Sequence, residues 1–427
     1  MTEGAASAKM ELKSNIAEKM ESAMYKKRTI EAVLKKAGKQ TKVVLLTGAR
    51  QVGKSTVIQH VFPEYEYCTL DDENELFLAK GDRALFFKDK HIPLIIDEVQ
   101  YAPELFRTIK LQVDGNSGKG QIFLTGSQRY ELMSEASESL AGRISIIEMS
   151  GLSMRELTDD DTTDAFIPSA EFVEKRKKKA EPLSDIWHVI HRGSMPELQD
   201  TDRDWEWFYR DYVRTYIERD VRKIINIKDE LKFRSFLISA AARSGQMLVC
   251  GDIARDIGVD IKTVQNWLSV VSASGMIRIV RPYQNNAIKR VIKTPKLYFM
   301  DTGLLCYLVG WNTARSARNG AMSGHIFETF VVSEIIKSHM NAGKSLDKIY
   351  YYRDKDKKEI DLVIENDNIL YPVEIKKSAT IDDKWSRPFS ILKKIPDKTV
   401  AEGIVICQID KAMPVGSDAR AIPVHMI

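Results

Sequence analysis

The stretch KVVLLTGARQVGKST, residues 42–56, decides how the first part of the chain folds. Its apolar, β-branched start at 43–46 predicts a buried strand. GARQVGKS at 48–55 then fits the pattern GxxxxGK[ST] between a strand and a helix. The glycines let successive backbone N–H groups turn toward phosphate oxygens, and the N-terminus of the next helix favours the anion. The sequence therefore predicts a phosphate-binding loop, or P-loop.

A P-loop of this kind indicates binding of ATP together with Mg²⁺. We expect Lys54 to reach the β- and γ-phosphates and the Ser55 hydroxyl to ligate Mg²⁺. The residues expected to contact the nucleotide are Gly48, Ala49, Arg50, Gln51, Val52, Gly53, Lys54, Ser55 and Thr56.

Two carboxylates follow the apolar run PLII at 93–96. Asp97, at the end of a strand, is suited to hold the Mg²⁺ shell, and Glu98 is suited to polarise a water for in-line attack on the γ-phosphate. An Asp-Glu pair alone is typical of a solvated turn. Combined with the P-loop, it predicts an ATP phosphohydrolase with Lys54, Asp97 and Glu98 as catalytic residues.

Two later segments offer further catalytic candidates. FLTGSQ at 123–128 ends a strand that we expect beside the strand of Asp97, so Ser127 or Gln128 is a candidate sensor of the γ-phosphate; a strand cap explains each equally well. SLAGR at 139–143 closes the next helix. Arg143 is a candidate finger for the site of a neighbouring subunit, which would make the chain a homo-oligomer. The alternative is a surface arginine favoured by the helix dipole.

Apolar runs alternate with helical stretches over the first part of the chain. The runs are 42–46, 65–70, 93–96, 121–125 and 144–149. Continuous apolar strands separated by helices are typical of a parallel sheet covered on both faces. The predicted fold class is therefore α/β.

Bulk composition narrows the class of protein. A chain of 427 residues is too long for one ordinary domain, and 44% hydrophobic with 29% charged residues is neither disordered nor membrane-like. Four scattered cysteines indicate reduced thiols, and the net charge of +4 is a small excess. Because the start lacks a signal peptide's apolar core and no run approaches ~20 apolar residues, we expect a cytoplasmic protein without a membrane partner.

The middle of the chain is mainly helical. The basic run KRKKK at 175–179 follows an acidic stretch, and we interpret the pair as an exposed connection. Residues 253–274 resemble a helix-turn-helix, with Gly258 in the turn. The following stretch carries a basic set that could lie along DNA phosphates as a wing, or could belong to a packing domain. This set is Lys289, Arg290, Lys293 and Lys296.

The most informative stretch after the P-loop is EIDLVIENDNILYPVEIK at 359–376. Two alternating apolar runs around a turn-forming tract predict a β-hairpin. If the turn centres between residues 367 and 368, Asp361 lies opposite Glu374 and Lys376 shares their face. Two carboxylates and a lysine on one face suit a Mg²⁺-dependent phosphodiesterase, in which the carboxylates bind metal and the lysine orients water.

Glu328 is expected to complete this metal set. It lies near the start of an amphipathic helix predicted over His325 to Ser338. Two alternatives remain: an exposed hairpin with a cross-strand salt-bridge network, or a nuclease fold that binds without cleaving.

The motifs TGARQVGKST, LIIDEVQ, LTGSQ and SLAGR, in that order, resemble a bacterial and archaeal family of AAA-type P-loop ATPases with an uncharacterised C-terminal domain. HRGSMPE at 191–197 and YVRTYIERDV at 212–221 resemble that family's lid, and the hairpin resembles the PD-(D/E)XK nuclease fold. Where the family usually has serines after LTG, this chain has SQR at 127–129, which leaves the sensor residue open.

The resemblance implies an AAA-type core at 1–160, a helical lid and linker at 161–230, a winged helix-turn-helix at 231–300 and a nuclease-like domain at 301–427. The leading hypothesis is an ATPase that acts on DNA and whose nucleotide state controls the C-terminal domain. One alternative is a regulatory switch of protein assembly with a non-cleaving C-terminal domain. The other is a Mg²⁺-dependent nuclease regulated by ATP.

Overall fold

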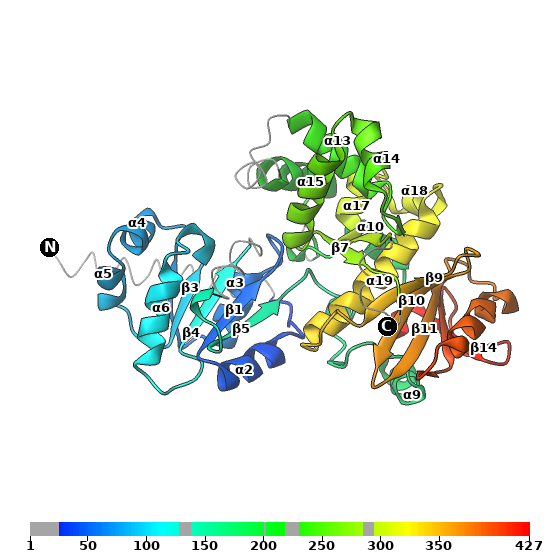
Figure 1. The fold of residues 1–427 in the computed structure, drawn as a ribbon, viewed down its shortest axis with the longest axis horizontal. Helices are drawn as coiled ribbons and strands as arrows, with labels where there is room; N and C mark the ends of the chain where they lie inside the picture. Colours follow the sequence, from blue (N-terminus) through cyan, green and yellow to red (C-terminus); the bar gives the residue numbers. More distant parts are fainter. Residues whose placement is uncertain (1–24, 128–137, 200–201, 218–229, 285–293) are drawn as a thin grey trace.

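A computed structural model describes residues 25–127, 138–199, 202–217, 230–284 and 294–427 (Figure 1). The P-loop domain, in blue and cyan, forms one end of the molecule. A group of helices in green and a sheet in orange and red form the other part. The yellow helix α19 (Ser323–Asn341) runs between the green helices and the orange sheet.

The P-loop domain is built on the parallel sheet that the sequence predicts. Its strand order is β2-β3-β4-β1-β5, and every pair is parallel. The strands are β1 (Val43–Thr47), β2 (Glu66–Thr69), β3 (Leu94–Asp97), β4 (Ile122–Gly126) and β5 (Ile144–Glu148). The accompanying helices are α2 (Glu31–Gln40), α3 (Lys54–Val61), α4 (Glu73–Gly81), α5 (Arg83–Lys88) and α6 (Leu105–Asp114), with a short helix η1 (Val99–Tyr101).

Both faces of this sheet are covered, which explains why the strands are continuously apolar. Val44 of β1 belongs to the core shared with Ile58 of α3, whereas the next residue, Leu45, belongs to the core shared with Phe106 of α6. Successive strand residues point to opposite faces, so each face needs its own apolar residues.

The middle region has two helices joined by a turn at the residues where the sequence predicts a helix-turn-helix. Helix α14 (Cys250–Ile257) ends at Gly258, whose φ of 66° turns the chain into α15 (Ile261–Ala273). A three-stranded sheet of order β6-β8-β7 accompanies the helices; β6 precedes them in the chain, and β7 and β8 follow them. The region's other elements are α8 (Met154–Leu157), α9 (Ala170–Lys179), α10 (Ile186–Arg192), η2 (Pro196–Leu198), α11 (Trp205–Asp211), η3 (Tyr212–Ile217), α13 (Glu230–Ala241), β6 (Gln246–Met247), β7 (Ile277–Val280) and β8 (Lys296–Phe299).

One expectation about the basic wing is wrong. Residues 289, 290 and 293 lie outside the described part of the chain, but Lys296 begins β8 and only 3% of its surface is exposed. A residue so deeply buried cannot lie along DNA phosphates. Its ammonium instead contacts carboxylates of the C-terminal region.

The basic run at 175–179 is also not a loop. It forms the end of α9, and Arg176 is 1% exposed. The Arg176 guanidinium donates to the backbone oxygen of Met426 at 3.1 Å and pairs with Asp160. Arg176 therefore fastens α9 to the far end of the chain, whereas the other four residues of the run are exposed, as expected.

The C-terminal region is a sheet of order β14-β15-β13-β11-β10-β9, with β12 beside β11. Its strands are β9 (Ile349–Arg353), β10 (Glu359–Asn366), β11 (Ile369–Ile375), β12 (Thr399–Val400), β13 (Gly403–Cys407), β14 (Met413–Val415) and β15 (Ala419–Pro423). Helices α17 (Thr302–Leu308) and α18 (Ala314–Asn319) precede α19, and η4 (Asp383–Lys394) and η5 (Val424–Met426) complete the region.

The hairpin register is confirmed, whereas the amphipathic helix is not. Leu362 pairs with Val373, so Asp361 lies opposite Glu374, and the turn residues 367 and 368 both have positive φ. Helix α19 is buried on all sides over most of its length, because it packs between the middle helices and the C-terminal sheet. No helix in the described ranges is long and apolar enough to span a membrane.

Candidate functional site

The P-loop follows β1 and turns sharply at Gly48. Its φ is 149°, and a Cβ there would lie 2.0 Å from the backbone oxygen of Met149, so only glycine fits. Lys54 begins α3 and donates from Nζ to the backbone oxygens of Gly48, at 3.1 Å, and Ala49, at 2.9 Å. The lysine thus folds over its own loop and contacts the loop's carbonyl oxygens.

A cavity of about 270 Å³ lies beside this loop. It brings together the P-loop and Glu98, as expected from their motifs, and adds Asp71 and Tyr101, which the motifs did not indicate. The lining residues are Arg50, Gln51, Gly53, Lys54, Ser55, Thr56, Asp71, Glu98 and Tyr101. Ala49 and Val52 instead line a small space behind the loop, together with Gly275 of the middle region.

Asp97, at the end of β3, lies against the P-loop. Its Oδ1 accepts a hydrogen bond from Ser55 Oγ at 2.7 Å, and its Oδ2 accepts one from Tyr67 Oη at 2.9 Å. The Thr125 hydroxyl of β4 also donates to Asp97. A hydroxyl and a carboxylate in contact fit the donor set that Mg²⁺ prefers.

Glu98 follows in a left-handed backbone conformation, with φ of 56°. The Gln100 side-chain amide donates to Glu98 and also to Ser127 Oγ, at 3.2 Å. Gln100 therefore links the acid with the candidate sensor, a role that the motifs did not indicate. The only signal was a long amide two residues beyond the Asp-Glu pair. Gln128 lies outside the described residues.

Burial shifts the pKa values of Lys54 and Glu98, which both line the cavity. Burial lowers the pKa of Lys54 to about 8, although the carboxylates of Glu98 and Asp97 oppose the shift. Burial also raises the pKa of Glu98, and the charge of Lys54 and the amide of Gln100 hold back part of that rise. A carboxylate with a raised pKa is a better proton acceptor, as a general base requires.

Arg143 lies at the end of the sheet where the parallel strands begin, opposite the end that carries the P-loop. Its backbone oxygen accepts from the N–H of Val43, at the start of β1, whereas the P-loop follows the end of β1. The guanidinium forms two hydrogen bonds with Asp114, of 2.5 and 3.0 Å. Arg143 therefore does not reach the nucleotide cavity of its own chain.

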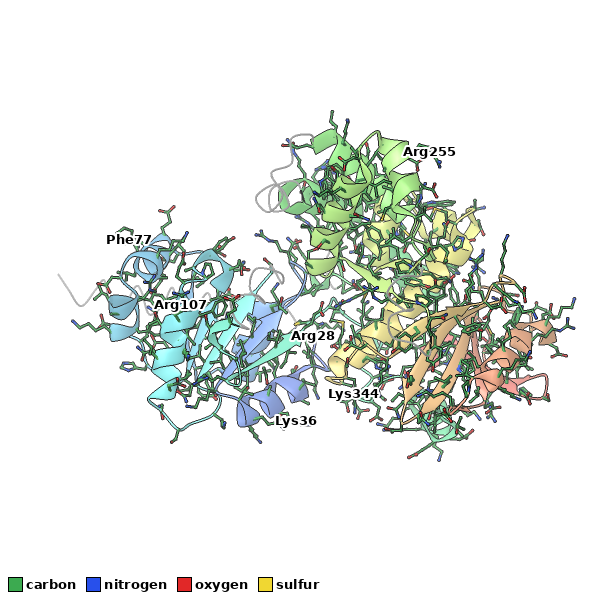
Figure 2. All side chains as sticks on the ribbon, viewed as in Figure 1. Arg28, Lys36, Phe77, Arg107, Arg255 and Lys344 are labelled. Carbon is green, nitrogen blue, oxygen red and sulfur yellow. The ribbon has the colours of Figure 1, made fainter. Side chains whose placement is uncertain are left out.

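Arg28, labelled in Figure 2 where the P-loop domain meets the rest of the molecule, contacts the P-loop, and the sequence motifs did not indicate it. Its guanidinium donates to the backbone oxygens of Val52 and Ser150, both at 2.8 Å, and pairs with Glu156 at 3.1 Å. Burial alone would raise the pKa of Glu156, but Arg28 and backbone N–H groups lower it below its ordinary value. This pair ties the loop to the segment that leaves β5.

The middle region touches the P-loop domain at the turn before β7. A Cβ on Gly275 would lie 3.5 Å from the backbone nitrogen of Ala49 in the P-loop. Three residues on, the Arg278 guanidinium pairs with Glu148, the last residue of β5. The turn before β7 thus lies beside the P-loop, and β7 is held to the end of β5.

A second cluster forms on the hairpin, as its register predicts. Asp361 Oδ2 accepts from the N–H of Ile375 at 2.8 Å and lies 3.9 Å from Lys376 Nζ. Lys376 also pairs with Glu374 Oε1 at 2.5 Å. The other oxygen of Glu374, Oε2, is buried and has no hydrogen-bond partner within the described ranges.

Glu328 does not complete a metal set in this structure. Its Oε1 accepts from Lys296 Nζ at 3.0 Å and from Tyr298 Oη at 2.8 Å. Across the described residues, no three His, Cys, Asp or Glu side chains are arranged to hold a metal ion. Lys296 lies among these acids, with Nζ 3.0 Å from Glu328 and 2.5 Å from Glu359. Burial, aided by the charge of Asp361, raises the pKa values of Glu328 and Glu374 above their ordinary range.

Three segments of the chain match known domain families, and one of them contains the P-loop. Residues 40–158 match the AAA domain. The first part of this chain is therefore similar to the AAA domain, and the match includes its P-loop. Residues 183–315 and 323–427 match two domains of unknown function, DUF8612 and DUF4143.

Two uncharacterised relatives are similar to this chain over most of its length. An uncharacterised protein of Mycobacterium tuberculosis is 27% identical over 407 residues, covering 95% of this chain and 85% of its own. An uncharacterised protein of Methanocaldococcus jannaschii is 23% identical, covering 77% and 73%. A Walker-type ATPase of Pyrococcus abyssi aligns with 65% of this chain and 94% of its own, at 16% identity and a TM-score of 0.40.

Proposed function

We propose that this protein binds ATP with Mg²⁺ at the P-loop and hydrolyses it. The observation that carries the proposal is the meeting of the two motifs, in which the Ser55 hydroxyl contacts the Asp97 carboxylate at 2.7 Å. Glu98 lines the same cavity as the loop. A phosphate-binding loop, a metal-binding pair and a carboxylate base are thus gathered in one place.

Each residue has a defined part in this proposal. Lys54 leaves the carbonyl oxygens of its loop and binds the β- and γ-phosphates, where its charge offsets the charge of the phosphates. Ser55 and Asp97 would hold Mg²⁺, which neutralises phosphate charge when bound. Glu98 orients the attacking water and accepts its proton, while Gln100 fixes the carboxylate.

The test is steady-state phosphate release with Mg²⁺ and ATP by the full chain and two variants. Lys54→Ala removes phosphate binding, so we expect both nucleotide binding and turnover to be lost. Glu98→Gln keeps the side-chain shape and removes the base, which lowers turnover by about 10²–10⁴-fold. Equal background rates in all three proteins would reject hydrolysis.

A second candidate function concerns the C-terminal cluster. We propose that Asp361 and Glu374 bind Mg²⁺ and that Lys376 assists cleavage of a nucleic-acid phosphodiester. The buried, unpartnered Oε2 of Glu374 supports this, because a polar atom in that state is costly unless a ligand satisfies it. Incubation of DNA and RNA with Mg²⁺ tests it: Asp361→Asn should abolish cleavage and leave ATP hydrolysis intact. Identical gels for both proteins would exclude nuclease chemistry.

The two proposed sites are joined through the middle region, which supports control of the C-terminal region by nucleotide. Strand β7 contacts the P-loop domain through Arg278, and it pairs with β8, which contacts the C-terminal cluster through Lys296. If ATP alters cleavage or DNA binding in the same incubation, the sites are coupled. If ATP alters only self-association, the protein is the regulatory switch of assembly instead.

A further inference from the structure

Lys296 is a buried cation of β8 in the middle region, and its ammonium contacts acidic side chains of the C-terminal region. Its side chain is 3% exposed, and Nζ lies 3.0 Å from Glu328, 2.5 Å from Glu359 and 3.8 Å from Asp361. Glu328 belongs to α19, and the other two acids belong to β10. Burial opposes the charge, but Tyr298 and these carboxylates hold the pKa of Lys296 well above its ordinary value.

Asp361 is enclosed by two ammonium groups. Its Oδ1 faces Lys296 at 3.8 Å, and its Oδ2 faces Lys376 at 3.9 Å and accepts from the N–H of Ile375. With Glu328, Glu359 and Glu374, the cluster has four carboxylates, against which stand these two ammonium groups and the Arg353 guanidinium, 3.3 Å from Glu359. The buried Oε2 of Glu374, which has no hydrogen-bond partner within the described ranges, is an acceptor that a further cation can use.

Strand β8 holds the lysine in this position. Lys296 pairs with Val280 of β7, and Tyr298, two residues on, donates to the same Glu328 oxygen that Lys296 contacts. Residues two apart on a strand share a face, so the two side chains enter the cluster together. Lys296 therefore cannot leave Glu328 without a shift of its strand or a change of its rotamer.

We propose that Lys296 is the resident cation of the C-terminal carboxylate cluster and competes there with a divalent metal ion. While the ammonium occupies the space between Glu328 and Asp361, these acids do not chelate metal together. When β8 withdraws Lys296, Glu328 joins Asp361 and Glu374. The inference rests on the proposed metal site and adds its control by the middle region.

The test is titration of nucleotide-free full-length protein with Mn²⁺, followed by electron paramagnetic resonance of the free ion. Lys296→Met keeps the length of the side chain and removes its charge. Because like charges a few ångströms apart repel strongly in a buried site, we expect Mn²⁺ affinity to rise at least about tenfold. Lys296→Arg keeps the charge and should bind Mn²⁺ no more tightly than wild type.

Two controls separate the site from the fold. Lys296→Met combined with Asp361→Asn should lose the added affinity, which excludes Mn²⁺ at the P-loop as its source. Lys296→Gln can still donate to Glu328 and should show the same gain if Lys296→Met fails to fold. In melting experiments, Mn²⁺ should raise the Tm of the neutral variants more than that of wild type, because a bound ligand stabilises in proportion to its affinity.

The outcomes are distinct. Tighter Mn²⁺ binding in both neutral variants that depends on Asp361 supports the competition. Equal, Asp361-dependent binding in wild type and the neutral variants overturns the role of Lys296 and leaves the metal site standing. Absence of Asp361-dependent binding in every protein overturns the metal site itself, and this inference with it.

Discussion

Ser55 and Asp97 share a hydrogen bond of 2.7 Å, although they come from different motifs. The contact arises because β1 and β3 both run toward the same edge of a parallel sheet, separated only by β4. Ser55 begins α3 after β1, and Asp97 ends β3. The account of ATP hydrolysis depends on this meeting, and the following predictions examine the residues around it.

Binding of ATP should weaken above about pH 8. Burial lowers the pKa of Lys54 to about 8 in the nucleotide-free protein, and only the protonated amine attracts phosphate. Each pH unit above that value should therefore lower the affinity about tenfold. Calorimetric titration with Mg²⁺ and ATP between pH 7 and 10 measures this. Lys54→Arg stays charged and should give a flat profile; a sloping one would assign the effect to another group.

Gln100→Leu should lower kcat about tenfold and leave KM nearly unchanged, because Gln100 orients Glu98 without lying at the cavity. Gln100 also holds down the pKa of Glu98. Its loss should move the acidic limb of the kcat profile to higher pH, a shift that simple loss of packing would not cause. Ser127→Ala removes the other partner of Gln100 and should have the smaller effect. An unmoved acidic limb would show that Gln100 does not tune Glu98.

Arg143 should act on the nucleotide of a neighbouring subunit, because it lies at the end of its own sheet opposite the P-loop. Arg143→Ala and Lys54→Ala should each be inactive alone. A mixture should regain activity, since the P-loop of the first can meet the arginine of the second. Such a finger contributes about 10³–10⁵ in rate. A fully active Arg143→Ala, or a mixture that stays inactive after proven subunit exchange, would contradict a shared site.

Arg28→Met should destabilise the fold by about 3–5 kcal/mol, because it leaves Glu156 buried without its cation. The pKa of Glu156 is depressed in the folded state. Its stabilisation is therefore present above the unfolded pKa and is lost as pH falls through the folded pKa. Urea unfolding from pH 3 to 7 should show a weaker acid dependence for Arg28→Met than for wild type. Arg28→Met with Glu156→Gln should recover part of the stability; full additivity would mean that the residues do not interact.

The sequence pattern predicts which residues meet when strand or turn geometry determines their contacts. The register that places Asp361 opposite Glu374 follows from a period of two around a turn at 367–368, and the structure has that register. The P-loop could also be predicted, because its motif is one continuous stretch of sequence at 48–55. Gln100 could have been recognised as well, since it lies only two residues beyond Glu98.

The buried cations could not be recognised in this way. Lys296 and Arg176 lie in basic stretches that look solvated, because lysine and arginine are usually exposed. Their burial depends on partners that the fold brings from elsewhere, such as Glu328 on α19 and the backbone of Met426. No periodicity in the sequence marks such a pairing. The same holds for Arg28, whose contacts lie far along the chain.

The central claim, hydrolysis at the P-loop with Glu98 as base, is tested most directly by a single-turnover experiment. Protein in excess is mixed with γ-labelled ATP and Mg²⁺, and bound ATP and released phosphate are followed together. Wild type should convert its bound ATP, whereas Glu98→Gln should bind ATP as tightly and hold it uncleaved for at least about 10² times longer. Conversion by Glu98→Gln at the wild-type rate would contradict the account.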